Sequence, residues 1–153
     1  MYQITQLLTE ELQLTQQLVS ILKEEQAILL NNEIESLQVI TENKTQLVNT
    51  LFLVDHKRLD VLKEANLADQ DNNMLKLLDR IAEPELQLLW QTLLSTTSEA
   101  KDLNNNNGLV LNRLAGNTQN ALAILRSQCP NDTILYGKDG QNTTTTPSLS
   151  TFS

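Results

Sequence analysis

The sequence predicts an all-α protein: an elongated antiparallel helical bundle, or coiled coil, of three long helices plus one short helix, with a disordered C-terminal tail. Two observations predict this class. The 153 residues are rich in leucine, glutamine and glutamate, hold only four glycines and three prolines, and are 3% aromatic. That composition favours helix over sheet. Apolar residues also recur at steps of three and four along three long stretches, which is the spacing of an amphipathic helix.

The first long helix is expected at residues 3–31, where no proline interrupts the pattern. Its apolar stripe is formed by Ile4, Leu7, Leu8, Leu14, Leu18, Ile21, Leu22, Ile28 and Leu29. The pair Asn31-Asn32 then breaks the run. Asn32 followed by Glu35 fits a capping box, in which the asparagine side chain accepts from free amides of the next turn. We therefore expect Asn32 to cap the second helix.

The second helix is expected from Glu33 to about Ala65. Its buried stripe consists of Ile34, Leu37, Ile40, Leu47, Leu51, Val54, Val61 and Leu62. Lys44 interrupts this stripe, and we interpret it as a lysine whose stem packs while its ammonium reaches water. Because the break before this helix is short, the first two helices should fold back as an antiparallel hairpin.

A connector and a short helix follow. Residues 66–73 are rich in Asp and Asn, which favour turns. The short helix is expected from Met74 to Ile81. Pro84, flanked by two glutamates, suits the first turn of the last helix, because proline fits the first helical position and carboxylates favour the positive helix end.

The last helix carries a seam at alternating steps of three and four, with the coiled-coil average of about 3.5 residues. The seam consists of Leu86, Leu89, Leu93, Thr96, Ala100, Leu103, Asn107, Val110, Leu114, Asn117, Ala121 and Leu125. Asn107 either fixes the register of the packed helices or marks where the bundle ends and the seam faces solvent. We favour the second interpretation, because Gly108 and Gly116 weaken the same region.

The chain divides into three parts by composition. Residues 1–103 hold the acidic excess behind the net charge of −8 and are interpreted as the bundle scaffold. The residues from 104 to 153 carry two acids and three bases and are nearly neutral, and 104–128 among them form the end of the last helix. This suits a partner-binding surface, although a segment free of selection for charge would look the same. Residues 129–153 contain Gly, Pro and a Thr/Ser-rich end, which predicts a flexible tail with a Leu-Tyr-Gly turn.

The two informative aromatic residues differ in their setting. Trp90 lies early in the last helix and is expected to pack in the core. Tyr136 lies outside any helix, in the turn Leu135-Tyr136-Gly137. Such a ring can anchor in a partner's pocket, or it can cap Ile134 and Leu135 packed back onto the bundle. Both alternatives stay open.

The sequence contains no motif that indicates a catalytic site or a metal site. The single histidine, His56, lies in the charged run 55–58, which we interpret as a solvated face, and Cys129 as an inert thiol. The pairs Glu10-Glu11 and Glu24-Glu25 are interpreted as solubilising faces. Catalytic and phosphate-loop motifs are absent. We expect no enzyme, no metal and no cofactor.

Charge and hydropathy also restrict the partners. The acidic chain lacks a basic patch that would bind a phosphate backbone, so no nucleic-acid partner is expected. No apolar run is long enough to span a bilayer, and the N-terminus lacks signal-peptide features. We expect a cytosolic protein without stable membrane insertion.

Several short motifs, in this order and spacing, resemble one known family. They are Asp102-Leu103-Asn104, Asn107-Gly108, Asn117-Thr118-Gln119-Asn120-Ala121-Leu122, Leu135-Tyr136-Gly137 and Asp139-Gly140. Together they resemble the flagellar export chaperones of the FlgN type. The likeness covers most of the chain, but only its C-terminal third is specific. Gly116 and Asn120 depart from the usual pattern.

The resemblance implies a cytosolic chaperone that escorts hook–filament junction proteins to the flagellar type III export gate. It implies that the C-terminal part of the last helix binds the C-terminal helical segment of the client. The residues carried over for client binding are Asn107, Leu111, Leu114, Thr118, Ala121, Leu122 and Leu125. It also implies that Tyr136 and Gly137 dock on the cytosolic domain of the gate. The alternative is a structural coiled-coil protein that self-associates through the same seam.

Overall fold

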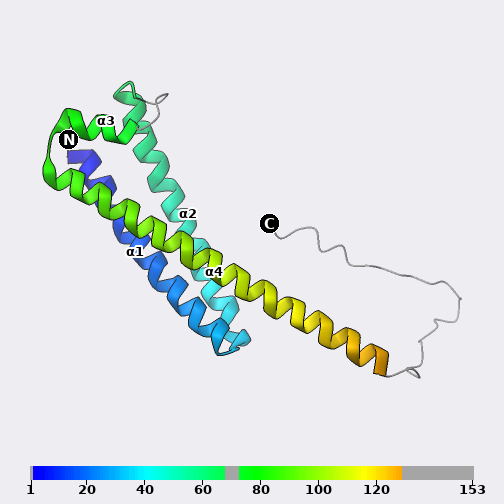
Figure 1. Ribbon diagram of the computed structural model, residues 1–153. Helices are drawn as coiled ribbons and strands as arrows, with labels where there is room; N and C mark the ends of the chain where they lie inside the picture. The colour runs from blue at the N-terminus through cyan, green and yellow to red at the C-terminus, as the bar shows by residue number, and fades with distance from the viewer. Residues whose placement is uncertain (1, 68–72, 129–153) are drawn as a thin grey trace, which may run out of the picture. The chain divides into compact units, whose positions relative to one another are not determined.

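The computed structural model describes residues 2–67 and 73–128 (Figure 1). Four helices follow one another in the chain: α1 (Tyr2–Leu30), α2 (Ile34–Glu64), α3 (Asn73–Ile81) and α4 (Pro84–Gln128). The described residues contain no strand. The predicted all-α class, with three long helices and one short helix, is confirmed. The tail predicted to be disordered lies outside the described residues.

The chain forms two compact units. The first unit is Met1–Leu114 and the second is Ala115–Ser153. The boundary between them falls inside α4, so the first unit holds α1, α2, α3 and most of α4. The described part of the second unit is the last part of α4, residues 115–128.

The turn between α1 and α2 differs from the predicted capping box. Asn32 has a φ of 58°, and no side chain caps the first residue of α2. The amide of Asn32 donates to the carbonyl of Leu29 at 3.3 Å, and the amide of Glu33 donates to that of Ile28 at 3.0 Å. These two bonds form the Schellman ending of α1, in which asparagine tolerates the left-handed conformation. Asn32 therefore ends α1, and the prediction that it caps α2 is wrong.

Ala82, directly after α3, also has a positive φ, of 54°. Alanine is strained in this conformation and glycine is not. We expect Ala82→Gly to raise the free energy of unfolding by about 1 kcal/mol, as measured by urea denaturation. Ala65→Gly is the matched control, because Ala65 ends α2 with a φ of −79° and should lose stability. Equal effects at the two positions would contradict the assignment of strain.

The core of the first unit joins all four helices. One cluster of buried residues contains Ile4, Leu8, Leu62, Leu67, Met74, Leu78, Leu86 and Leu93, with Trp90 packed against it. A second cluster, further along α1, contains Val19, Leu22 and Ala100. Since residues later in α4 meet residues later in α1, these two helices run parallel, while α2 runs antiparallel to α1. The expected packing of Trp90 is confirmed.

The seam of α4 keeps the predicted period within the first unit. Its most buried residues, Leu86, Leu93, Ala100 and Asn107, are spaced seven apart. Leu89, Thr96, Leu103, Val110 and Leu114, between and after them, are half-buried. A repeat of seven is the coiled-coil period, so the regular side of α4 faces its neighbours in the first unit.

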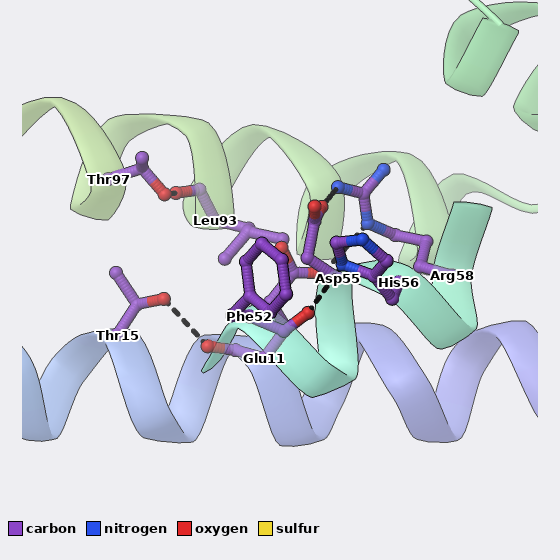
Figure 2. A network of polar contacts seen from close by, with 8 residues as sticks. All are labelled: Glu11, Thr15, Phe52, Asp55, His56, Arg58, Leu93 and Thr97. Atoms are coloured by element: carbon purple, nitrogen blue, oxygen red, sulfur yellow. Dashed lines mark hydrogen bonds and ion pairs between the residues drawn. The ribbon is translucent and has the colours of Figure 1, made fainter. Parts of the chain in front are cut away.

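A polar network lies beside the first core cluster (Figure 2). The Nε of Arg58 on α2 donates to Oε2 of Glu11 on α1 at 2.9 Å, and its Nη2 donates to Asp55. The guanidinium carbon also lies 5.3 Å from the ring centroid of Trp90 on α4. The side chains of Glu11 and Arg58 are each 12% exposed. The solubilising role predicted for Glu11 is therefore wrong, and so is the solvated role predicted for Arg58.

Burial raises the pKa of the Glu11 carboxyl above its ordinary value of 4.5, although the nearby Arg58 acts to lower it. His56, by contrast, is exposed, and its ring lies 4.0 Å from that of Phe52. The charged run 55–58 thus has one exposed side, as predicted, and one side that ties α2 to α1.

Candidate functional site

The residues predicted to bind a partner lie on α4, and their burial changes along the helix. In the first unit, Asn107 is only 3% exposed. Leu111, about one turn later, is 44% exposed, while Leu114 is half-buried. Leu109, which the sequence reasoning did not select, is 59% exposed. After Asn107, the last buried residue of α4, the helix keeps exposed apolar side chains at Leu109 and Leu111.

The second unit presents the rest of the predicted residues. Thr118, Ala121, Leu122 and Leu125 are all exposed, with Leu122 at 49% and Leu125 at 59%. The neighbouring Ile124, also missed by the sequence reasoning, is 55% exposed. Arg126 is the only charged residue among the described residues of this unit. We call the exposed apolar residues Leu122 and Leu125, which lie one turn apart on the same side of the helix, the α4 strip.

Asn107 occupies a buried polar cluster of the first unit, which we call the Asn107 cluster: Glu25, Lys44 and Asn107. The Nδ2 of Asn107 donates to the carbonyl of Leu22 at 2.9 Å and to Oε2 of Glu25 at 2.8 Å. The interpretation that the seam faces solvent at Asn107 is therefore wrong. Because α1 supplies both acceptors, the asparagine aligns α4 with α1, which is the register-fixing alternative.

The predictions for Glu25 and Lys44, the other two members of the Asn107 cluster, were also wrong. Glu25 is 5% exposed, and its Oε1 accepts from Nζ of Lys44 at 2.6 Å. Lys44 therefore pairs with a buried carboxylate instead of reaching water alone, and Glu25 is not a solubilising residue. The sequence holds one indication that Glu25 is buried and needs a partner. Glu25 occupies a position of the apolar stripe of α1, three residues after Leu22 and four before Leu29.

The residues predicted to dock on the export gate, Tyr136 and Gly137, lie outside the described residues. The structure places neither of them. Their assignment stays a prediction, as does the division of function between residues 1–103, 104–128 and 129–153.

The described residues also bear on other kinds of site. Across residues 2–67 and 73–128, no group of three or more His, Cys, Asp and Glu side chains could hold a metal ion. Within the same ranges, no helix has the length and hydropathy needed to cross a bilayer. The chemistry that the α4 strip offers is burial of apolar side chains against another molecule.

Comparison with known proteins identifies the family to which this chain belongs. A family model described as "FlgN protein" matches residues 1–144. The chain is 30% identical over 135 residues to the flagella synthesis protein FlgN of Yersinia enterocolitica, covering 87% of this chain and 84% of the relative. It is 32% identical over 138 residues to the protein of the same name from Proteus mirabilis, covering 87% and 86% of the two chains.

A shorter match links the chain to Salmonella typhimurium. There the flagella synthesis protein FlgN is 36% identical over 106 residues, covering 69% of this chain and 64% of the relative. No solved structure matches. Because the family model spans nearly the whole chain and these relatives align over most of it, the chain belongs to the FlgN family of flagella synthesis proteins.

Proposed function

We propose that this protein is a cytosolic, non-enzymatic chaperone of flagellar type III export. It binds the C-terminal helical segment of hook–filament junction proteins, prevents their premature assembly and delivers them to the export gate. The observation that carries this proposal is the α4 strip. Leu122 and Leu125 are 49% and 59% exposed, and Arg126 is the only charged residue in residues 115–128.

Such a strip supports binding of a partner helix. A client helix laid along it would bury apolar side chains on both partners, and each fully buried leucine contributes roughly 1.5–3 kcal/mol. A near-neutral polar face adds little electrostatic affinity, so binding would depend on shape and apolar area. Covering a client's assembly helix in this way would keep it from polymerising until release.

The residues of the proposed client site have different parts in this proposal. Leu111, Leu114, Thr118, Ala121, Leu122 and Leu125 supply the contact surface. Asn107 aligns the first-unit part of α4 with α1, through its hydrogen bonds to Leu22 and Glu25. The absence of cofactors and metals from this proposal follows from the type of interaction, which needs only packing and hydrogen bonds.

A binding titration tests the client site. We expect Leu122→Asp to weaken binding of a labelled C-terminal peptide of a junction protein by about 2 kcal/mol, or about 30-fold. The reason is that a carboxylate would be buried where a leucine was. Asn120→Asp is the matched control, because it adds the same charge on the same helix at an exposed position outside the α4 strip. Unchanged affinity in Leu122→Asp would remove this residue from the site.

Docking on the export gate is a separate step, assigned to Tyr136 and Gly137. We expect Tyr136→Ala to weaken capture of the purified cytosolic gate domain while leaving the affinity for the client peptide unchanged. Tyr2→Ala is the control, since Tyr2 is an exposed tyrosine at the start of α1. Loss of client binding in Tyr136→Ala would place Tyr136 in the client site instead.

A self-associating coiled-coil protein is the second candidate, because the same α4 strip could pair between copies. Sedimentation at increasing concentration separates the two functions. Oligomers that disappear when residues 115–153 are deleted, together with no affinity for client peptides, would favour self-association. A monomer that binds the peptide favours the chaperone.

A further inference from the structure

A groove in the first unit opens between α2 and α4, with α1 as its floor. It consists of two adjoining hollows of about 270 and 210 Å³, which share Lys44 and Asn104 in their linings. The floor is formed by Leu18, Leu22 and Leu29. We call this the α2–α4 groove. Along α4 it extends from Thr97 to Leu111, which is about 21 Å of helix or about 14 residues.

The groove exposes apolar surface at both ends. Val48, on the α2 side of one hollow, is 45% exposed, and Leu111, on the α4 side of the other, is 44% exposed. Apolar side chains in a concave surface of this length suit an amphipathic helix lying in a groove.

The α4 wall leaves room for the backbone of such a helix. Gly108 lines the groove, and a Cβ atom added there would meet nothing within 4 Å. Glycine in the middle of a helix lowers its stability, but it lets another backbone approach closely. Since none of the described residues of the first unit occupies this space, the glycine has no packing role among them.

Asn107 provides a second, independent observation. It lines the same hollow and is 3% exposed, yet its Oδ1 atom accepts no hydrogen bond among the described residues. The amide cannot simply be reversed, because its Nδ2 already donates to the Leu22 carbonyl and to Glu25. A buried acceptor without a donor is costly, so a donor from a bound partner would stabilise it.

The charge of the groove lining indicates which kind of helix it would bind. Lys44 and Lys101 line it, and the only carboxylate in its lining is Glu25, which is already paired with Lys44. This lining is therefore slightly cationic in a protein whose net charge is −8. A helix that carries a carboxylate beside Lys101 complements it.

We propose that the α2–α4 groove binds an amphipathic helix of the client, of about 14 residues, as a fifth helix packed on the first unit. The client helix places its apolar face on α1, its backbone near Gly108, a hydrogen-bond donor at Asn107 and a carboxylate near Lys101. This inference rests on the proposed chaperone function, and it adds a second contact region to the α4 strip.

Filling the groove tests the proposal. We expect Gly108→Leu to weaken binding of the C-terminal peptide of a hook–filament junction protein at least tenfold, measured by titration calorimetry, because the added side chain occupies the client's space. Folding should not suffer, since leucine favours helix over glycine and the new Cβ has open space. Asn106→Leu is the matched control, because it adds the same side chain to an exposed position that does not line the groove.

A charge reversal gives a second readout. Lys101→Glu should weaken binding about fivefold at low salt and less at high salt. Lys57→Glu, at an exposed position outside the groove, should leave binding unchanged.

If both groove variants bind as the unaltered protein does while Leu122→Asp weakens binding, the groove proposal is overturned and the chaperone proposal stands. If Gly108→Leu changes only a monomer–oligomer equilibrium, a second copy occupies the groove and the proposal is likewise overturned. If the unaltered protein binds no client peptide, the proposed function itself fails.

Discussion

Arg58→Ala is expected to lower the free energy of unfolding by about 3 kcal/mol at pH 7. The guanidinium of Arg58 donates to Glu11 and Asp55 and lies over the ring of Trp90. Removing it leaves the Glu11 carboxylate, 12% exposed, without its partner and close to a second acid. The cost of an uncompensated buried charge accounts for most of the expected loss.

This loss should depend on pH, and the sign follows from Glu11. Burial already raises the pKa of the Glu11 carboxyl, and Arg58 is the group that lowers it. The pKa should therefore rise further in Arg58→Ala. A carboxyl whose pKa is raised on folding contributes stability below its unfolded pKa and loses that contribution as pH rises through the folded value. The variant should thus differ least from the unaltered protein near pH 4 and most at pH 7.

Urea denaturation at the two pH values checks this prediction. Lys63→Ala is the matched control, because the Lys63–Asp60 pair is 63% and 65% exposed and such surface pairs contribute roughly 0–1 kcal/mol. The double variant Glu11→Gln with Arg58→Ala should recover part of the loss at pH 7, since no charge is then left buried. An equal loss at pH 4 and pH 7 would show that packing on Trp90, and not the charge of Glu11, is the main contribution.

Leu8→Ala is expected to lower the free energy of unfolding by about 3–4 kcal/mol. Leu8 is 0% exposed and belongs to the cluster in which α1, α2, α3 and α4 meet. Truncating it removes apolar contacts and leaves a cavity that residues from four helices would have to fill. The loss should be the same at pH 4 and pH 7, because no titratable group is involved.

The control for this prediction is Leu53→Ala. Leu53 has the same chemistry but is 61% exposed on α2, so its truncation should change stability by less than about 0.5 kcal/mol. Both variants can be compared by urea denaturation followed by circular dichroism. Similar losses at the two positions would mean that Leu8 is not at the centre of the core.

Much of the fold followed from the period of the apolar residues. Steps of three and four predicted the three long helices, and the seam of α4 keeps its repeat of seven through Leu86, Leu93 and Ala100 to Asn107. Burial of an apolar side chain stabilises its helix whichever partner covers it, so the period alone predicts these elements. The helix ends were less certain, because asparagine serves both helix starts and helix ends. Asn32 fits the pattern of a helix start, but it ends α1 with a φ of 58°.

The candidate site was predictable in its exposed part and not in its buried part. The α4 residues that the family resemblance implies for client binding include Leu122 and Leu125, which the structure describes as exposed. Glu11, Glu25 and Asn107 were misread, although each occupies a stripe or seam position. A polar residue in such a position is stable only if it has a partner, and that partner lies far away in the sequence.

The sequence by itself determined which segments are helical, which side of each helix is apolar, and the family likeness. Only the tertiary structure decided that Glu25, Lys44 and Asn107 come together and that a groove stays open between α2 and α4. The physical reason is that helix period is a local property of the chain. The pairing of buried polar groups depends on how separate helices are aligned, which a single stripe does not encode.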